Sequence, residues 1–397
     1  MTAARTALVI GGGIAGPVTA MALRKAGIEA EVYESYAGPA DGVGVTLTIA
    51  PNGLAALDAI GAGDAVRAIG QPMNRTVMHD GTGGTLGAFP GLEDLPPSLA
   101  LWRDELCRAL HERARERGVR VHHGKRLVAA DEGDGGVTAR FADGTTAEAD
   151  VLVGADGIRS TVRGLIDPAA PGPDASRLLN FGAAAAVAVP AEPDAMYFVF
   201  GRRAFFGYWV QPDGRTAWFA NVPHDRAMTA AEAREVPNDE WMRRLRALYA
   251  DDTPGRQILD HTAADDLVVL GSMESMPKVP TWHRGRMVLV GDAAHAPSSS
   301  SGQGASMAIE SAVQLARCLR DAADVDAAFA AYQGLRRERV ERVIDRGAKT
   351  NNSKTLGAVA RTMMRLMMPL MLRTFLNPER TLGPEQRYRI DWDAPAV

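Results

Sequence analysis

Three glycines near the N-terminus have the spacing that binds the pyrophosphate of a dinucleotide. They form the pattern GxGxxG directly after Thr6–Ile10, a short apolar run that predicts a buried parallel strand. The first glycine allows a tight turn, the second lets the backbone approach a pyrophosphate, and the third lets a helix pack closely on the strand. The N-terminus of that helix offers free N–H groups to the anion. The residues expected to contact a dinucleotide here are Gly11, Gly13, Ile14, Ala15 and Gly16.

A carboxylate follows the second predicted strand, at residues 31–34. Glu34 lies at the distance beyond the glycines at which a carboxylate accepts hydrogen bonds from the adenosine ribose. Because a carboxylate disfavours a 2′-phosphate, we expect FAD or NAD(H) rather than NADP(H) at this site. The alternative is an incidental glycine turn beside a solvated Glu34.

Two further buried strands are predicted to run into glycine-bearing loops. Val151–Val153 leads to Gly154–Gly157, and Met287–Val290 leads to Gly291 and Asp292. Between them, residues 176–276 contain short aromatic and β-branched runs that predict an antiparallel sheet. A bare nicotinamide-binding unit would not need the two later glycine loops, so they favour a flavin nucleotide.

The three loops together resemble the group A flavoprotein monooxygenases, whose prototype is para-hydroxybenzoate hydroxylase. Residues 154–163 (GADGIRSTVR) are similar to the family's DG motif, and residues 291–297 (GDAAHAP) with 302–304 (GQG) are similar to its GD motif. Arg103, in LWRDEL, and the loop from Asp41 to Gly44 also match the family's flavin-side pattern. The resemblance implies an α/β fold: a Rossmann-like FAD-binding domain, an interleaved antiparallel-sheet substrate domain and C-terminal helices.

The resemblance also implies roles for individual residues. Asp292 would bind the ribityl chain of FAD, Arg103 would lie against its ribityl-phosphate side, and Asp156 would lie near the pyrophosphate, in a motif also implicated in nicotinamide use. A helix beginning after Gly304 would direct the positive end of its dipole at the flavin. This chain has Ser306 where the family often has Asn, and a hydroxyl reproduces only part of an amide's hydrogen bonding. The remaining residues implied near FAD are Gly44, Gly291, Pro297, Gly302, Gly304 and Ala305.

The implied reaction places the chemistry on the cofactor rather than on a catalytic side chain. NADPH or NADH would reduce FAD, O2 would add as a C4a-hydroperoxyflavin, and the distal oxygen would pass to the substrate. The protein would then have to exclude water from the site. The sequence shows no Ser/His/Asp arrangement and no metal-ligand spacing among its eight histidines. His295, within the GD motif, is best interpreted as a structural histidine bonded to backbone.

The predicted middle sheet is rich in aromatic rings, and some of them are candidates to line a substrate cavity. Alternate residues of a strand share a face, so Phe198 and Phe200 form one pair and Phe206 and Tyr208 another. These four rings and Trp218 are the substrate candidates; the sequence does not decide which pair faces the flavin, and a core role is the alternative for each. Such a pocket suits an aromatic or polycyclic natural product.

Length and composition predict how these elements are organised. A chain of 397 residues exceeds the usual limit of a single core, so we expect two lobes. The predicted FAD-binding domain comprises residues 1–75, 101–175 and 277–340, the substrate domain residues 76–100 and 176–276, and a helical C-terminal segment residues 341–397. The methionine-rich stretch at residues 362–376 is interpreted as a helix packed over the core, with a substrate lid or a subunit contact as alternatives.

Charge and cysteine content limit the partners and the compartment. The formal net charge of −4 argues against nucleic-acid binding, which needs a basic face. Cys107 and Cys318 lie far apart and predict buried free thiols. We expect a cytoplasmic monomer or homodimer without a membrane span, acting on a small molecule. Two other functions stay open: a flavin-dependent dehydrogenase or reductase on the same fold, and a non-catalytic nucleotide-binding scaffold.

Overall fold

The computed structural model describes residues 2–38, 45–133, 135–352 and 377–397. Gly44 and the methionine-rich stretch at residues 362–376 therefore lie outside the described residues. No helix within the described ranges is long and apolar enough to cross a membrane. Cys107 and Cys318 are both buried and free, as predicted.

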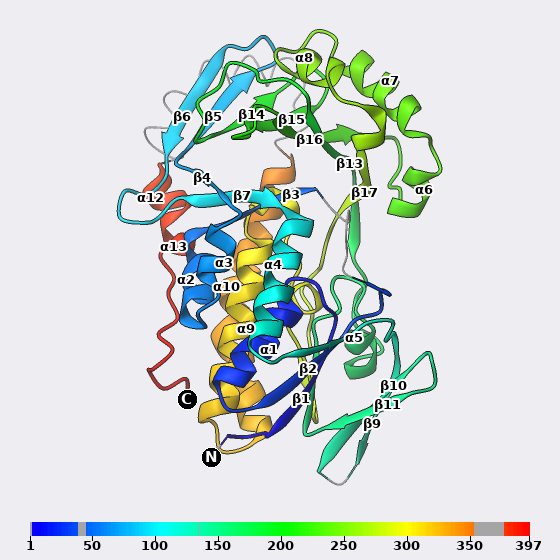
Figure 1. Cartoon of the computed structure of the whole chain (residues 1–397), viewed down its shortest axis with the longest axis vertical. Coiled ribbons are helices and arrows are strands. Elements are labelled where there is room, and N and C mark those ends of the chain that lie inside the picture. The colour runs from blue at the N-terminus through cyan, green and yellow to red at the C-terminus, as the bar shows by residue number, and fades with distance from the viewer. Residues whose placement is uncertain (1, 39–44, 134, 353–376) are drawn as a thin grey trace.

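A six-stranded sheet forms the lower part of the molecule in Figure 1. Four strand pairs at its centre are parallel, and only the short edge strand β18 is antiparallel to its neighbour. The predicted strands at residues 151–153 and 287–290 are confirmed within one residue, whereas the strand predicted at 31–34 begins two residues earlier and ends before Glu34. In spatial order the strands are β18 (His283–Arg284), β19 (Met287–Leu289), β12 (Val151–Gly154), β1 (Thr6–Ile10), β2 (Glu29–Tyr33) and β8 (Arg120–His122).

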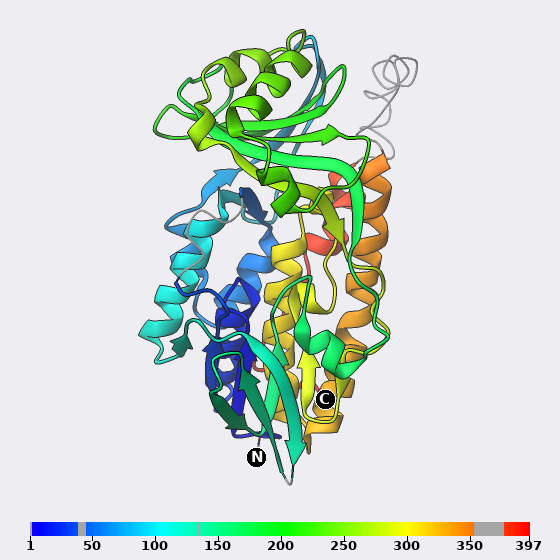
Figure 2. The same cartoon turned by 90° about the vertical axis from the view of Figure 1, so that its right-hand side faces the viewer.

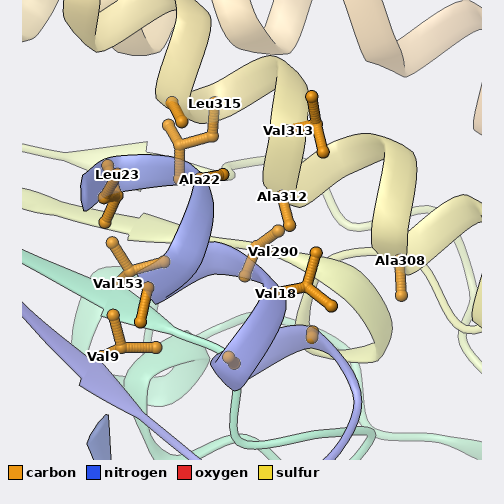
Figure 3. Close-up of a cluster of buried hydrophobic side chains, with 14 of the residues drawn as sticks. Val9, Val18, Ala22, Leu23, Val153, Val290, Ala308, Ala312, Val313 and Leu315 are labelled. Carbon is orange, nitrogen blue, oxygen red and sulfur yellow. The ribbon is translucent and has the colours of Figure 1, made fainter. Parts of the chain in front are cut away.

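Helices pack on this sheet and extend away from it. Figure 3 shows Val18 and Ala22 of α1 between the sheet residues Val9 and Val153 and the helix α9, where Ala312 lies opposite. Alanine and valine at these positions let the elements approach closely and bury a continuous apolar core. The helices of this half are α1 (Ala15–Lys25), α2 (Pro51–Ala59), α3 (Gly63–Arg67), α4 (Arg103–Glu116), α5 (Thr161–Ile166), α9 (Gly304–Asp321), α10 (Val325–Asn352), α12 (Pro378–Thr381) and α13 (Gly383–Gln386).

A seven-stranded, mostly antiparallel sheet lies above the helices in Figures 1 and 2. One face packs against α7 (Asn238–Leu248) and α8 (Gly255–Asp260) and forms a second apolar core. The short helix α6 (Ala230–Arg234) contacts the edge strand β17. In spatial order the strands are β17 (Val268–Ser275), β13 (Asp174–Ala185), β16 (Thr216–Pro223), β15 (Phe205–Val210), β14 (Ala195–Phe200), β5 (Arg75–Asp80) and β6 (Thr85–Pro90).

Two small sheets complete the described fold. One carries a hairpin turn at Asp143 and Gly144, and Gly144 has the positive φ of 83° that such a turn requires. The other places β7 beside β3 and β4, so residues 98–102 do not join the seven-stranded sheet. The strands are β9 (Leu127–Gly133), β10 (Gly136–Phe141) and β11 (Thr146–Ala149), and then β3 (Thr46–Ile49), β7 (Ser98–Trp102) and β4 (Gln71–Met73). We propose that the two large cores correspond to the two domains.

A buried ionic cluster joins α9 to α10. The Glu310 carboxylate binds Arg336 at 2.6 Å and Arg339 at 2.9 Å, and it accepts a hydrogen bond from Asn52 of α2 at 2.7 Å. The Glu310 and Arg336 side chains are both 0% exposed. Because a buried charge is costly without a partner, this cluster holds three helices in one arrangement.

Breaking this cluster should therefore destabilise the fold. Arg336→Met leaves part of the buried Glu310 charge uncompensated, and we expect the free energy of unfolding to fall by about 3–5 kcal/mol. Arg342→Met is the matched control on the same helix, because its ion pair with Glu338 is exposed; exposed pairs contribute less than about 1 kcal/mol. Denaturant unfolding of both variants measures the difference, and equal midpoints would contradict a stabilising role for the cluster.

Candidate active site

One cavity joins the carboxyl ends of the parallel strands to the seven-stranded sheet. Its volume is about 620 Å³. The loops after β1, β12 and β19 all contribute, since parallel strands place their carboxyl ends along the same edge of a sheet. The side chains that line it include Arg103, Asp292 and Pro297 at one end and Phe198 and Trp209 at the other.

The glycine loop has the geometry that the GxGxxG pattern predicts. Gly11 has a φ of +105°, and a Cβ placed there would lie 2.4 Å from the carbonyl oxygen of Ala155. A Cβ on Gly16 would lie only 1.9 Å from the carbonyl oxygen of Gly11, so α1 packs on β1 at a distance that no side chain permits. A Cβ on Gly13, in contrast, would meet only the Arg103 guanidinium, at 3.9 Å, leaving open space in the cavity beside the loop.

These residues fit a dinucleotide such as FAD. Open space at Gly13, the N-terminus of α1 and the charge of Arg103 suit a pyrophosphate. Ile14 and Ala15 also line the cavity. Gly291, at φ +63°, lets the third loop pack closely, because its Cβ would lie 3.0 Å from that of Ala15.

Glu34 is held at the end of β2 by the backbone. Its Oε2 accepts a hydrogen bond from Gly12 N at 2.5 Å, and its Oε1 accepts from Tyr36 N at 2.8 Å and from the Ser35 hydroxyl at 3.0 Å. A carboxylate has about four acceptor positions, so capacity for a ribose hydroxyl remains. The ribose contact itself stays a prediction.

Asp292 lies beside the glycine loop and faces the cavity. Its side chain is exposed to the cavity, but the protein atoms that surround it displace water and raise the pKa of the carboxyl group, and the positive charge of Arg103 opposes that rise. Arg103 is the first residue of α4, directly after β7, which brings its side chain to the same end of the cavity. The pair therefore supplies one acceptor and one cationic donor at the cofactor end of the site.

The Asp156 side chain holds its own loop and is not among the residues that line the cavity. Its carboxylate accepts hydrogen bonds from Thr161 N at 2.7 Å, Val162 N at 3.2 Å and the Ser160 hydroxyl at 2.5 Å, so it caps α5. Burial raises the pKa of Asp156. Ala155, Gly157 and Ile158 provide the cavity surface of this loop. Direct contact of Asp156 with a cofactor stays a prediction.

The loop before α9 and the first two residues of that helix line the cavity, whereas Ser306 does not. Pro297, Gly302, Gly304 and Ala305 are all cavity residues. Ser306 is fully buried and is not one of them: its Oγ accepts a hydrogen bond from Ala50 N at 3.1 Å, and a Cβ on Gly53 would lie 2.6 Å from that oxygen. Contact of Ser306 with the cofactor stays a prediction.

His295 is buried and held by a side chain rather than by the backbone. Its Nε2 lies 2.8 Å from the Ser311 hydroxyl, which corrects the backbone partner inferred from sequence. Burial lowers the pKa of His295 to about 3, and the charge of Arg336 contributes. The imidazole is therefore neutral at physiological pH.

The seven-stranded sheet divides its aromatic residues between two faces. Phe198 and Phe200 line the cavity, as predicted for one of the two pairs. Phe206, Tyr208 and Trp218 belong instead to the apolar core beneath α7 and α8, so the prediction that they line the cavity is wrong. The physical reason is the period of two along each strand, which points alternate side chains to opposite faces.

The sequence reasoning missed several side chains of the seven-stranded sheet that line the cavity. The alternation along each strand separates two sets of residues: Phe205, Trp209, Phe219 and Asn221 lie on the face opposite to Phe206, Tyr208 and Trp218. Gly207 marks the same face, since a Cβ there would lie 2.2 Å from the Phe219 ring. Pairing the strands decides which face is which, and a single strand does not carry that information. The missed residues include Asn180, Met196, Phe205, Trp209, Phe219 and Asn221, together with Leu270, Ser272 and Glu274 of the edge strand β17.

Comparison with known proteins gives matches over most of the chain. Residues 4–347 match the family described as FAD binding domain. The chain is 31% identical to the aurachin C monooxygenase/isomerase of Stigmatella aurantiaca, over 84% of this chain and 85% of that protein. It is 33% identical to a 3-amino-4-hydroxybenzoate 2-monooxygenase of Streptomyces platensis, over 84% and 85%. The fold is similar to Klebsiella pneumoniae HpxO crystallised with FAD and uric acid, with a TM-score of 0.83, 23% identity and coverage of 96% and 97%.

The open space at Gly13 gives a direct test of cofactor binding. Gly13→Ala should leave the free energy of unfolding of the apoprotein within about 1 kcal/mol of wild type. The added methyl group would occupy cavity space, so FAD affinity should fall at least tenfold, the effect of about 1.4 kcal/mol. Flavin fluorescence titration of the apoprotein measures the affinity.

Gly16→Ala is the structural comparison. Its Cβ would collide with the Gly11 carbonyl, so we expect it to lose stability as well as FAD affinity. Wild-type FAD affinity in Gly13→Ala would contradict the placement of the pyrophosphate at this loop.

Proposed function

Because the chain belongs to the FAD-binding domain family, which it matches over residues 4–347, we propose that it oxygenates a small aromatic or heterocyclic molecule. The chain is an FAD-dependent monooxygenase of the NAD(P)H-consuming type, and the substrate class is the proposed part. One observation supports it most: a single cavity connects the glycine loop and the start of α9 to the aromatic face of the seven-stranded sheet. We further propose a cytoplasmic monomer or homodimer.

When bound, FAD supplies the chemistry that the side chains lack: it takes hydride from NAD(P)H and activates O2. The protein's task is binding, orientation and electrostatics. Gly13, Arg103 and Asp292 would hold the nucleotide at one end of the cavity. Gly304 begins α9, whose positive dipole end would stabilise negative charge that develops nearby.

The aromatic face would hold the substrate and exclude water. Its rings pack against one another, with centroid distances of 5.6 Å between Phe198 and Phe205 and 6.1 Å between Phe205 and Phe219. Large rings give contact area with little flexibility and favour stacking with a flat ligand. Excluding water would prevent side reactions of reactive intermediates before oxygen reaches the substrate.

A flavin-dependent dehydrogenase or reductase on this fold would bind its cofactor in the same cavity, and a scaffold would bind it without turnover. The purified protein separates these functions by colour and oxygen use, because only a redox flavoprotein bleaches with NAD(P)H and recovers in air.

We expect the purified protein to bind FAD and to show a flavin absorbance spectrum. Bleaching of the flavin by NADH or NADPH should accelerate when an aromatic substrate is bound, because we expect substrate binding to bring the flavin and the nicotinamide into position for hydride transfer. Stopped-flow absorbance with a panel of aromatic compounds measures this. A colourless protein that cannot be reconstituted with FAD would falsify the proposal.

The two faces of β15 give a matched pair of variants. Phe206→Ala removes a ring that is fully buried in the second core, and we expect the free energy of unfolding to fall by about 3–5 kcal/mol. Phe205→Ala removes a neighbouring ring that lines the cavity, and its main effect should be on substrate affinity and KM. Thermal unfolding measures stability and steady-state kinetics measures KM for both variants. A larger loss of stability in Phe205→Ala and a larger rise of KM in Phe206→Ala would show that the two faces are assigned wrongly.

A further inference from the structure

A histidine outside the cavity holds the glycine loop in place. His111 lies on α4, and its Nε2 forms a hydrogen bond with the carbonyl oxygen of Gly12. A carbonyl oxygen can only accept, so the imidazole is the donor and carries a hydrogen on Nε2. His111 is not among the residues that line the cavity, whereas Gly13, the next residue of the loop, is one of them.

Helix α4 meets the glycine loop with one of its faces. It packs beside α1 (Figure 1), and its residues Arg103, Cys107 and His111 follow at intervals of four, which places them on the same side of the helix. Arg103 approaches the loop from the cavity, where a Cβ on Gly13 would lie 3.9 Å from its guanidinium. His111 contacts the loop two turns further along the helix. One helix face therefore holds the loop at two points.

Side chains fix the peptide groups on both sides of Gly12. Gly12 N donates to Glu34 Oε2 at 2.5 Å, and the Gly12 carbonyl oxygen accepts from His111. The peptide between Gly12 and Gly13 is trans, so its C=O and its N–H point in opposite directions. The hydrogen bond from His111 thus directs the Gly13 N–H away from the imidazole. Gly13 lines the cavity, where a backbone N–H suits an anion.

We propose that His111 is a positioning residue for the FAD pyrophosphate, because it fixes the peptide whose N–H would face that group. Three consecutive glycines, Gly11 to Gly13, give this segment more backbone freedom than other residues would. A loop that is already ordered binds more tightly than one that its ligand must order. The inference rests on the proposed placement of the nucleotide at this loop, and it does not depend on which substrate is oxygenated.

Competition titrations of the apoprotein test the proposal, with flavin fluorescence as the signal and ADP and adenosine as the competitors. ADP carries two phosphates and adenosine carries none. His111→Leu removes the donor but keeps an apolar side chain of moderate size. We expect its affinities for FAD and for ADP to fall about three- to tenfold, as for the loss of one hydrogen bond, while its affinity for adenosine stays unchanged.

Two further variants control for the donor and for the loss of a histidine. His111→Gln keeps an N–H group near the position of the imidazole Nε2, so it should restore most of the affinity for FAD and ADP. His122→Leu makes the same exchange at a histidine that binds Glu31 on β2 at 2.7 Å. It should bind all three ligands like wild type, even if its denaturant midpoint falls. A merely structural role of His111 would lower the midpoint without distinguishing ADP from adenosine.

Several results would overturn the proposal. They are wild-type affinity for ADP in folded His111→Leu, an equal loss for ADP and adenosine, or a glutamine variant that binds FAD and ADP as weakly as the leucine variant. Circular dichroism of the apoproteins shows whether each variant is folded. His111→Phe, which keeps a flat ring without the N–H, replaces the leucine variant if that one does not fold.

Failure of the proposed function gives a different result. In that case FAD-loaded wild type would oxygenate no compound, while the leucine variant would still bind FAD and ADP more weakly than wild type. The reverse combination, oxygenation by wild type and unchanged ADP affinity in the leucine variant, would overturn the role of His111 alone.

Discussion

The close packing of α1 on β1 is the constraint on which the site depends. It exists because Gly16 has no side chain, since a Cβ would lie 1.9 Å from the Gly11 carbonyl oxygen. This contact directs the N-terminus of α1 toward the loops that follow β12 and β19. Those loops bring Asp292 to the same place, and α9 then packs on the outer side of α1. One backbone contact thus positions the N-terminus of α1, and with it the dinucleotide site at the inner end of the cavity.

The second half of the site depends on how the seven-stranded sheet uses its two faces. One face is closed by α7 and α8 and buries the rings of Phe206, Tyr208 and Trp218. The other face stays open to the cavity, and Gly207 makes room there for the Phe219 ring. Both faces are aromatic, but within the described residues only one has helices packed on it.

Much of this arrangement could be predicted from the sequence, because local patterns determine it. The glycine spacing predicted Gly11, Gly13 and Gly16 with their individual roles, and the apolar runs predicted the parallel strands around them. The face of the aromatic sheet could not be predicted, since Phe198 and Phe206 lie in equally apolar strands and only strand pairing and helix packing distinguish them. The surroundings of Ser306 could not be predicted for a related reason: its hydroxyl accepts a hydrogen bond from Ala50 N, in a segment more than 250 residues earlier. Long-range contacts of this kind leave no trace in local sequence.

The most direct test of the central claim is the fate of molecular oxygen. The purified protein, loaded with FAD, would be incubated with NAD(P)H, ¹⁸O₂ and an aromatic compound that accelerates flavin bleaching, and the product would be analysed by mass spectrometry. Our account predicts a product heavier by one ¹⁸O atom. An oxidised or reduced product without ¹⁸O, formed at a similar rate, would contradict it and would identify the protein as a dehydrogenase or reductase on this fold.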